Sequence, residues 1–408
     1  MGKPETRAVD KRMRFVTEVE AGEETVTELC RRFGWSRKTG HKWLERYRCK
    51  GIEGLTDQPR VPHEHPHAVA AEIARRCVMV RHAHPSWGPV KVRAWLERNY
   101  PKVAWPAAST IGVLFDNAGL TAHRKRRRRA VPSGPLFACS SPNDVWCIDF
   151  KGWFLTGDGK RCEPLTLSDA HSRYLLHCQA VTRTDTEHVW PVLDVAFRDY
   201  GLPLRLRSDN GPPFASTGAA GLSQLAVKVI KAGVLPERIA PGKPEQNGRL
   251  ERLHLTLLRD TAQPPARTLR EQLDRLRIFQ RLYNEERPHA ALDNATPSEH
   301  YAPSPRRWDG VLREPEYPTD RALRRVRPNG AIRWRDAEVY LTQALAGETV
   351  ALTEREGGSW AVHYGPIELG IIDHRAPLLR KPKPAACGFV DNPDGLPTTP
   401  QAQQPQQV

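Results

Sequence analysis

Three acidic residues stand in sequence contexts suited to binding a divalent cation. Asp149 lies in the apolar run VWCIDF, Asp209 lies in the turn SDNG after the run LRLR, and Glu251 follows the loop PGKPEQNG on a predicted helix. A carboxylate at the end of a buried strand is unfavourable unless a cation or hydrogen bonds compensate its charge. Two acids at strand ends and one on a facing helix can gather at one side of a sheet. Hard oxygen ligands of this kind suit Mg²⁺ or Mn²⁺.

Each acid also has a simpler explanation. Asp149 can pair with Lys151 or Arg173, Asp209 can be an ordinary turn residue, and Glu251 can be an exposed helix residue. The sequence alone leaves these alternatives open at this point.

The region that must position the acids, residues 136–303, alternates strand-like and helix-like runs, which predicts an α/β fold. The strand candidates are 145–150, 163–168, 174–180 and 204–207. The helix candidates are 187–200, 222–232 and a long helix over about 246–260. Short β-type runs in residues 304–375 predict a small antiparallel β-barrel. Residues 376–408 hold seven prolines and five glutamines and are expected to be a disordered tail.

The N-terminal region, residues 1–60, has the pattern of a helix-turn-helix. A helix over 27–33, capped by Thr25 or Thr27, is broken by Gly34, and Ser36 can cap a second helix over 37–48. This arrangement is typical of major-groove DNA binding, although a solvated basic helix in a small bundle is an alternative. The outward face of the second helix presents Arg37, Lys38, His41, Lys42 and Arg46.

A second helical domain is predicted over residues 61–122, with helices at 68–81, 89–99 and 106–117, and it resembles another helix-turn-helix. A Gly- and Pro-rich linker over 51–66 precedes it, and the three histidines at 63, 65 and 67 lack a matching ligand cluster for a metal site. A basic linker over 123–135 follows. It contains Arg124, Lys125, Arg126, Arg127, Arg128 and Arg129. Such a block is expected to bind phosphates without sequence preference; a localisation signal or a solvated linker is the alternative.

The distribution of charge supports this division of tasks. The 408 residues carry a formal net charge of +15, and residues 1–135 alone hold 27 Lys+Arg against 14 Asp+Glu, a net +13. The remaining 273 residues are almost neutral, at +2. No membrane span, signal peptide, C-x-x-C pair or phosphate-binding G-x-x-x-x-G-K-[ST] loop is recognisable, so a cytoplasmic protein of a reducing compartment is expected.

Four segments together resemble the integrase core of DDE transposases and retroviral integrases: DVWCIDFKG (144–152), LTLSDAHSRYLL (165–176), RSDNGPPF (207–214) and PGKPEQNGRLERLH (241–254). The similarity is greater to bacterial insertion-sequence transposases, which place helix-turn-helix units in front of the core. These proteins end the core with a motif like YNEERPHAAL (283–292) followed by TPSEHY (296–301). The resemblance covers roughly residues 10–372 and implies a ribonuclease-H-like core.

Carried over by position, Asp149, Asp209 and Glu251 fall on the metal-binding triad of that family. The gaps hold 59 and 41 residues, and the second is longer than in retroviral relatives. Glu245 is a rival for the third acid, but Glu251 directly follows N-G-R-L as the family's acid does. The resemblance implies contacts to DNA near the scissile phosphate, with loop packing as the alternative, by Lys243, Gln246, Asn247 and Arg252. Asp169, His254 and His289 are expected to be structural or supporting residues.

The resemblance implies a metal-dependent transposase. Such an enzyme binds the terminal inverted repeats of its element, cleaves the 3′ ends and joins them to target DNA with two Mg²⁺ or Mn²⁺ ions per active site. The expected partners are double-stranded DNA and further copies of the chain, at least a dimer during catalysis, with no membrane association. A bacterial, nucleoid-associated location is expected. The alternatives are a catalytically silent regulator or DNA-bridging protein of transposase descent and, less favoured, a hydrolytic nuclease on the same fold.

Overall fold

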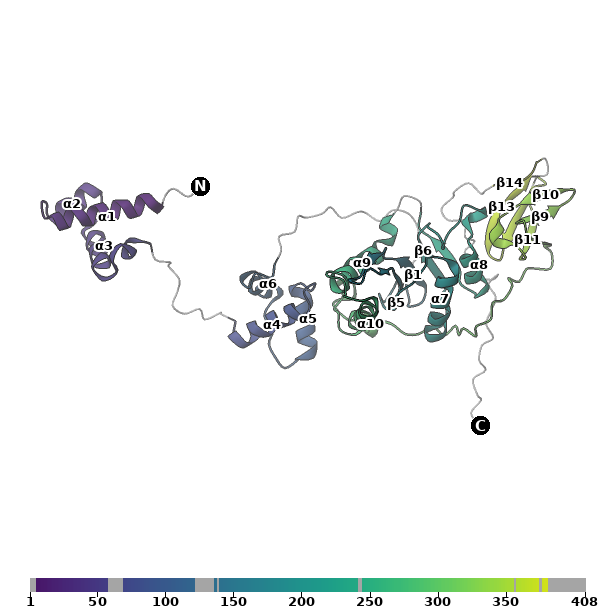
Figure 1. Ribbon diagram of the computed structural model, residues 1–408, viewed down its shortest axis with the longest axis horizontal. Coiled ribbons are helices and arrows are strands. Elements are labelled where there is room, and N and C mark those ends of the chain that lie inside the picture. Colours follow the sequence, from purple (N-terminus) through teal and green to yellow (C-terminus); the bar gives the residue numbers. More distant parts are fainter. Residues whose placement is uncertain are drawn as a thin grey trace, which may run out of the picture. The chain divides into compact units, whose positions relative to one another are not determined.

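The computed structural model describes residues 5–57, 69–121, 136–137, 139–240, 244–355, 357–373 and 376–380 (Figure 1). The chain divides into two compact units, residues 1–68 and 69–408. Within the described ranges, none of the helices combines the length and apolar character needed to cross a bilayer. The basic run 124–129 and Lys243 lie outside the described residues.

The N-terminal unit contains the predicted helix-turn-helix. Its elements are α1 (Glu5–Ala21), α2 (Val26–Phe33), α3 (Arg37–Lys50) and the 3-10 turn η1 (Gly51–Leu55). Thr25 caps α2 in a capping box with Glu28, and Ser36 caps α3 by accepting from the Thr39 amide at 3.2 Å. Gly34 adopts a φ of 72° where α2 ends, a left-handed conformation that favours glycine. The predicted helix, glycine turn and helix are therefore confirmed.

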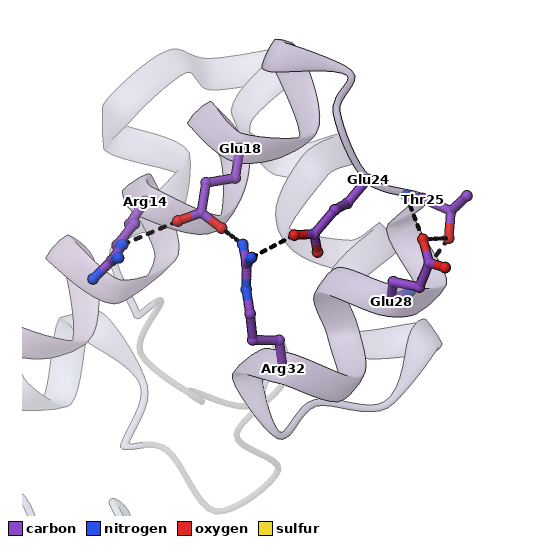
Figure 2. Close-up of polar contacts among 6 residues, drawn as sticks. All are labelled: Arg14, Glu18, Glu24, Thr25, Glu28 and Arg32. Carbon is purple, nitrogen blue, oxygen red and sulfur yellow. Dashed lines mark hydrogen bonds and ion pairs between the residues drawn. The ribbon is translucent and has the colours of Figure 1, made fainter.

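Apolar packing and an ion-pair network hold the three helices together. Their shared core contains Phe15, Val16, Leu29, Cys30, Trp43, Leu44 and Leu55. On the surface, Figure 2 shows Arg32 of α2 between two acids, Glu18 of α1 and Glu24 of the connecting turn, with 2.6 Å separating Arg32 Nη1 from Glu24 Oε1. Arg14 pairs with the same Glu18 at 3.0 Å. Because exposed ion pairs contribute little each, the buried apolar cluster is the main source of stability in this unit.

The second helical domain consists of α4 (Ala71–Ala83), α5 (Pro89–Asn99) and α6 (Ala108–Asn117). It has a core of its own, made by Cys77, Trp87, Val92, Leu96, Trp105, Ile111 and Phe115. Polar contacts join it to the central domain of the same unit: Ser86 Oγ lies 3.2 Å from Asp260 Oδ2, and Arg98 pairs with Glu299 at 2.8 Å.

The central domain is built on a five-stranded sheet in the order β5-β4-β1-β6-β7. The strands are β1 (Val145–Phe150), β4 (Pro164–Asp169), β5 (Leu175–Ala180), β6 (Arg205–Ser208) and β7 (Leu235–Arg238), with a separate hairpin of β2 (Phe154–Leu155) and β3 (Arg161–Cys162). β1 pairs antiparallel with β4 and parallel with β6. The four predicted strands are present, whereas β7 was not predicted.

Helices cover both faces of this sheet. They are α7 (Thr186–Tyr200), α8 (Gln224–Lys231), α9 (Gly248–Thr261) and α10 (Leu269–Glu285), and the short elements are η2 (Ala219–Gly221), η3 (Pro244–Asn247), η4 (Ala290–Leu292) and α11 (Pro297–His300). Side chains alternate along β1: Trp146 and Ile148 pack in the cluster with α7 and α8, whereas Val145 and Cys147 pack in the cluster with α9 and α10. This alternation places the next odd-numbered residue, Asp149, on the α9 side.

The C-terminal region forms an open sheet, and a closed β-barrel is not confirmed. Its five-stranded sheet has the order β14-β13-β12-β11-β8, and β10 and β9 form a separate pair. The strands are β8 (Ala322–Arg325), β9 (Ala331–Trp334), β10 (Ala337–Tyr340), β11 (Thr349–Glu354), β12 (Trp360–Tyr364), β13 (Ile367–Asp373) and β14 (Ala376–Arg380), with the 3-10 turn η5 (Gln343–Leu345) before β11. Among the described strands no pairing joins β14 to β8.

Two further features of this region differ from the expectation. Residues 376–380, predicted as the start of the tail, form β14 because Leu379 and Arg380 pair with Ile372 and Ile371; residues 381–408 lie outside the described residues. The sheet also shares one apolar cluster with α8, which includes Ile230 and Val350, and Lys231 pairs with Glu348 at 2.9 Å. One face of the C-terminal sheet is therefore buried against the central domain.

Candidate active site

The three acids come from elements that meet at one edge of the central sheet. Asp149 is on β1, Asp209 directly follows β6, and Glu251 lies in the first turn of α9. The parallel register pairs Cys147 with Arg207, so its continuation brings Asp149 level with Asp209. Carboxyl ends of neighbouring parallel strands open onto the same edge of a sheet, which is a common place for functional sites.

The electrostatics of Asp149 reflect this arrangement. Burial raises the pKa of Asp149 to about 7, and the negative charges of Asp209 and Glu251 raise it as well, while Lys151 acts in the opposite direction. The Asp149 side chain is only 20% exposed. A buried carboxylate whose pKa is raised by two neighbouring carboxylates lies in an environment in which a cation is favourable.

Polar side chains hold Asp149 from the α9 side. Asn247, at the N-terminus of α9, donates from Nδ2 to Asp149 Oδ2 at 3.2 Å. His254 Nδ1 lies 4.0 Å from the same oxygen, and its Nε2 shares a 2.7 Å hydrogen bond with the Thr166 hydroxyl. Burial and the charge of Lys151 lower the pKa of His254 to about 4, so the imidazole is neutral near pH 7. The carboxylate is therefore held by one neutral donor, the Asn247 amide, beside a neutral imidazole.

The donor set fits a hard divalent cation in its chemistry. Carboxylate oxygens are the ligands that Mg²⁺ and Mn²⁺ prefer, and a bound cation would relieve the repulsion that raises the pKa of Asp149. Within the described residues, however, no three His, Cys, Asp or Glu side chains converge closely enough to form a complete metal-binding group.

The residues expected to contact DNA near the acids occupy different environments. Asn247 is buried and bonded to Asp149, and Gln246 Oε1 accepts from the Ala240 amide at 2.7 Å. Both side chains therefore make hydrogen bonds within the protein, and their contact with DNA stays a prediction. Arg252 is exposed, whereas the side chain of Glu245 lies outside the described set.

The structure also describes the environments of other residues that the sequence singled out. Asp169 is 1% exposed and accepts from the Asn143 amide and from Ser172, so its role is structural. In the N-terminal unit, Arg37, Lys38, His41 and Lys42 are exposed on α3, while Arg46 is half-buried with its guanidinium 5.2 Å from the Trp43 ring.

Sequence reasoning did not identify the supporting roles of Asn247 and Thr166. Helical spacing contains a signal for the first, because positions 247, 251 and 254 fall on one side of α9. No comparable signal exists for Thr166, since its contact to His254 depends on how β4 and α9 pack across the sheet.

Family models match both the central domain and the N-terminal helical region. Models described as integrase core domain match residues 140–244 and 232–297, and models described as homeodomain-like domain match residues 6–56 and 39–114. The BIV integrase catalytic core has 20% identity and a TM-score of 0.31, covering 39% of this chain and 93% of that one.

Two proteins of bacterial insertion elements are similar over most of their length. The 31.7 kDa protein of IS407 from Burkholderia multivorans is 31% identical over 231 residues, which is 56% of this chain and 79% of that protein. The 39.2 kDa protein of IS476 from Xanthomonas euvesicatoria is 26% identical over 267 residues, 64% of this chain and 74% of that protein. The chain therefore belongs to the family of bacterial insertion-sequence transposases with an integrase-type core.

Proposed function

We propose that the protein binds the terminal inverted repeats of an insertion sequence, cleaves the 3′ ends and transfers them into target DNA. The observation that supports this most is the electrostatic interaction of Asp149 with both Asp209 and Glu251 at one edge of the sheet. In the reaction, an oxygen of water or of a DNA 3′-hydroxyl forms a bond to phosphorus, and the bond from phosphorus to the leaving 3′ oxygen breaks. The protein supplies no covalent nucleophile in this scheme.

Asp149, Asp209 and Glu251 would hold two Mg²⁺ or Mn²⁺ ions. When bound, these ions lower the pKa of the attacking hydroxyl and stabilise charge on the leaving oxygen. Asn247 keeps the Asp149 carboxylate in one orientation through its 3.2 Å hydrogen bond. The neutral His254, fixed by Thr166, fills the space beside that carboxylate without adding a competing positive charge. Asn247, Thr166 and His254 act as positioning residues.

Other parts of the chain would hold the DNA. We assign recognition of the element ends to the exposed basic face of α3, and phosphate contacts to the run 124–129, Lys243 and Arg252. Asn247, whose side chain donates to Asp149, is assigned to positioning, and Gln246 stays a proposed DNA contact. Two ends must be joined in one event, so at least a dimer on DNA in the bacterial nucleoid is proposed.

The test is a strand-transfer assay with a labelled element-end oligonucleotide, plasmid DNA and Mg²⁺ or Mn²⁺. Wild type is expected to join the oligonucleotide to the plasmid, and Asp149→Asn is expected to lose joining while retaining end binding in a gel-shift assay. Asp199→Asn, an exposed acid on α7, is the matched control and should join normally. Equal joining by wild type and Asp149→Asn would refute the assignment. End binding without joining by wild type would favour the silent regulator.

A further inference from the structure

A strongly cationic pocket lies beside α9, on a different side of the helix from the acids. Its volume is about 710 Å³, and its walls come from α5, residues 136, 137 and 139, α9, α10 and the following loop. The residues that line it include no Asp or Glu. They include six cationic side chains: Lys91, Arg173, Arg207, Arg249, Arg252 and Arg287.

Half of these cations are already engaged. Arg207 pairs with Glu237 at 2.6 Å, Arg287 pairs with Asp260 at 3.2 Å, and Arg249 donates to the Ala170 carbonyl at 2.7 Å. These contacts fix three positive groups around the pocket. Glu237 and Asp260 compensate two of the positive charges, and the other four cationic side chains keep the pocket positive.

The other three cations make no ion pair with any described residue. They are Lys91, Arg173 and Arg252. The Nη1 atom of Arg173 is buried without a hydrogen-bond partner, and so is Nε2 of His289, another lining residue. A buried donor normally has a partner, so the unpartnered Nη1 of Arg173 in a positive pocket indicates a missing acceptor.

The proximity of like charges is unfavourable without an anion. Burial lowers the pKa of Lys91 to about 7, and the charges of Arg287 and Arg252 lower it as well. Burial and Arg249 also lower the pKa of Arg173. A bound anion would reverse these effects and satisfy the free donors.

The pocket is separate from the proposed metal site. Its α9 residues are Gly248, Arg249, Arg252 and Thr256, which follow one helical stripe. The acid cluster uses positions 247, 251 and 254 of the same region, which lie on another stripe. The pocket therefore needs a ligand of its own.

The volume of the pocket and the residues that line it restrict the size and chemical class of the ligand. A pocket of about 710 Å³ suits a small ligand or one or two nucleotides, not a duplex. Phe137 and Tyr283 line it beside the cations. Basic side chains together with aromatic ones are the composition of sites that bind single-stranded nucleic acid.

We propose that this pocket binds the phosphates of a single DNA strand, such as a strand separated from its complement at an element end. This inference rests on the proposed function, because that function supplies the DNA. Arg173 and Lys91 would contact phosphate oxygens, and the aromatic walls would contact a base.

Alkylation of Cys139 provides a local test. Cys139 lines the pocket and is half-buried, whereas Cys49 in the N-terminal unit gives the rate of an exposed thiol. The full chain is treated with N-ethylmaleimide in EDTA, with and without a single-stranded octanucleotide, and each cysteine is quantified by peptide mass spectrometry. At a strand concentration about ten times the Kd, mass action predicts about tenfold slower alkylation of Cys139.

The variant Lys91→Gln/Arg173→Gln removes two cations that make no ion pair with described residues, so no ion pair is lost. Protection of Cys139 should fall below about twofold at the same strand concentration. The slope of log K against log salt should decrease in magnitude by about 1.4 for the loss of two phosphate contacts. Arg270→Gln, an exposed α10 residue outside the pocket, is the control and should leave protection unchanged.

Several outcomes would overturn the proposal. Equal protection of Cys139 in wild type and the double variant would show that the cations do not bind the strand. Equal protection by a duplex of the same sequence would contradict a single-strand site, and protection by pyrophosphate but not by the octanucleotide would identify a free phosphate compound as the ligand. Since EDTA prevents joining, a negative strand-transfer assay does not affect this result, and the two proposals fail independently.

Discussion

The helix-turn-helix depends on a close approach at Gly40, which can be tested by adding a single methyl group. A Cβ on Gly40 would lie 2.9 Å from Cζ of Phe15 and closer still to Sγ of Cys30. Phe15 and Cys30 are 0% and 1% exposed, so neither side chain has free space to move into. Gly112 in α6 offers a matched control, because its added Cβ would lie 3.6 Å from the nearest atom, Pro89 Cγ.

The two Gly→Ala substitutions should therefore change the free energy of unfolding in opposite directions. Alanine in a helix interior gains about 1 kcal/mol over glycine. Overpacking costs about 1–3 kcal/mol. Because two buried atoms would lie within 3.0 Å of the added Cβ, we expect a cost of about 2–3 kcal/mol here, so Gly40→Ala should lose a net of about 1–2 kcal/mol. Gly112→Ala should gain about 1 kcal/mol, since no overpacking opposes the helix propensity.

Native-state hydrogen exchange measured by mass spectrometry can follow each domain within the full chain. Peptides from α2 and α3 should exchange about 5–30 times faster in Gly40→Ala, which corresponds to 1–2 kcal/mol, while peptides from α6 should exchange more slowly in Gly112→Ala. If Gly40→Ala slows exchange as Gly112→Ala does, the close packing of α3 against α1 and α2 is not present in solution.

Three further predictions concern charge. The Arg207 side chain is only 4% exposed, and Glu237→Gln would leave its guanidinium without a counter-charge. This substitution should lower the free energy of unfolding, measured in urea, by about 3–5 kcal/mol. A loss near zero would contradict the buried ion pair. The pKa of Lys91 is lowered to about 7 in the folded protein, so its protonation opposes folding below pH 7, and this free-energy penalty decreases as pH rises from about 7 towards the pKa of the unfolded chain. Lys91→Met should therefore be more stable than wild type at pH 6 and lose that advantage near pH 10. A stability difference that does not change with pH would argue against burial of the ammonium. Deleting residues 124–129 should decrease the magnitude of the salt-dependence slope of duplex binding by about 5, and an unchanged slope would mean that the run does not contact phosphates.

The sequence predicted those parts of the fold that depend on residues close together in the chain, such as helix caps and apolar strands. The caps Thr25 and Ser36 and the glycine at position 34 define the helix-turn-helix because each acts on its own helix end. The strand over 145–150 was predicted by its apolar run, and the structure gives the same bounds. β7 was missed because LPER is short and only alternate residues are buried.

Contacts between distant segments could not be predicted in the same way. The acids were identified by motif, but the raised pKa of Asp149 depends on how β1, β6 and α9 pack. The predicted C-terminal barrel is not confirmed, because strand number and spacing do not specify closure; the strands form a five-stranded sheet and a separate pair, and their apolar cluster also includes residues of α8. The cationic pocket combines residues from positions 91 to 291, which no local pattern connects.

The central claim is that Asp149, Asp209 and Glu251 together support metal-dependent joining of DNA ends, and the identity of the third acid tests it most directly. Joined product should be measured in Mg²⁺ for wild type, Glu251→Gln and Glu245→Gln, with end binding measured in parallel. The account predicts that wild type and Glu245→Gln join DNA, while Glu251→Gln binds ends but yields no joined product. Normal joining by Glu251→Gln together with loss of joining by Glu245→Gln would contradict it.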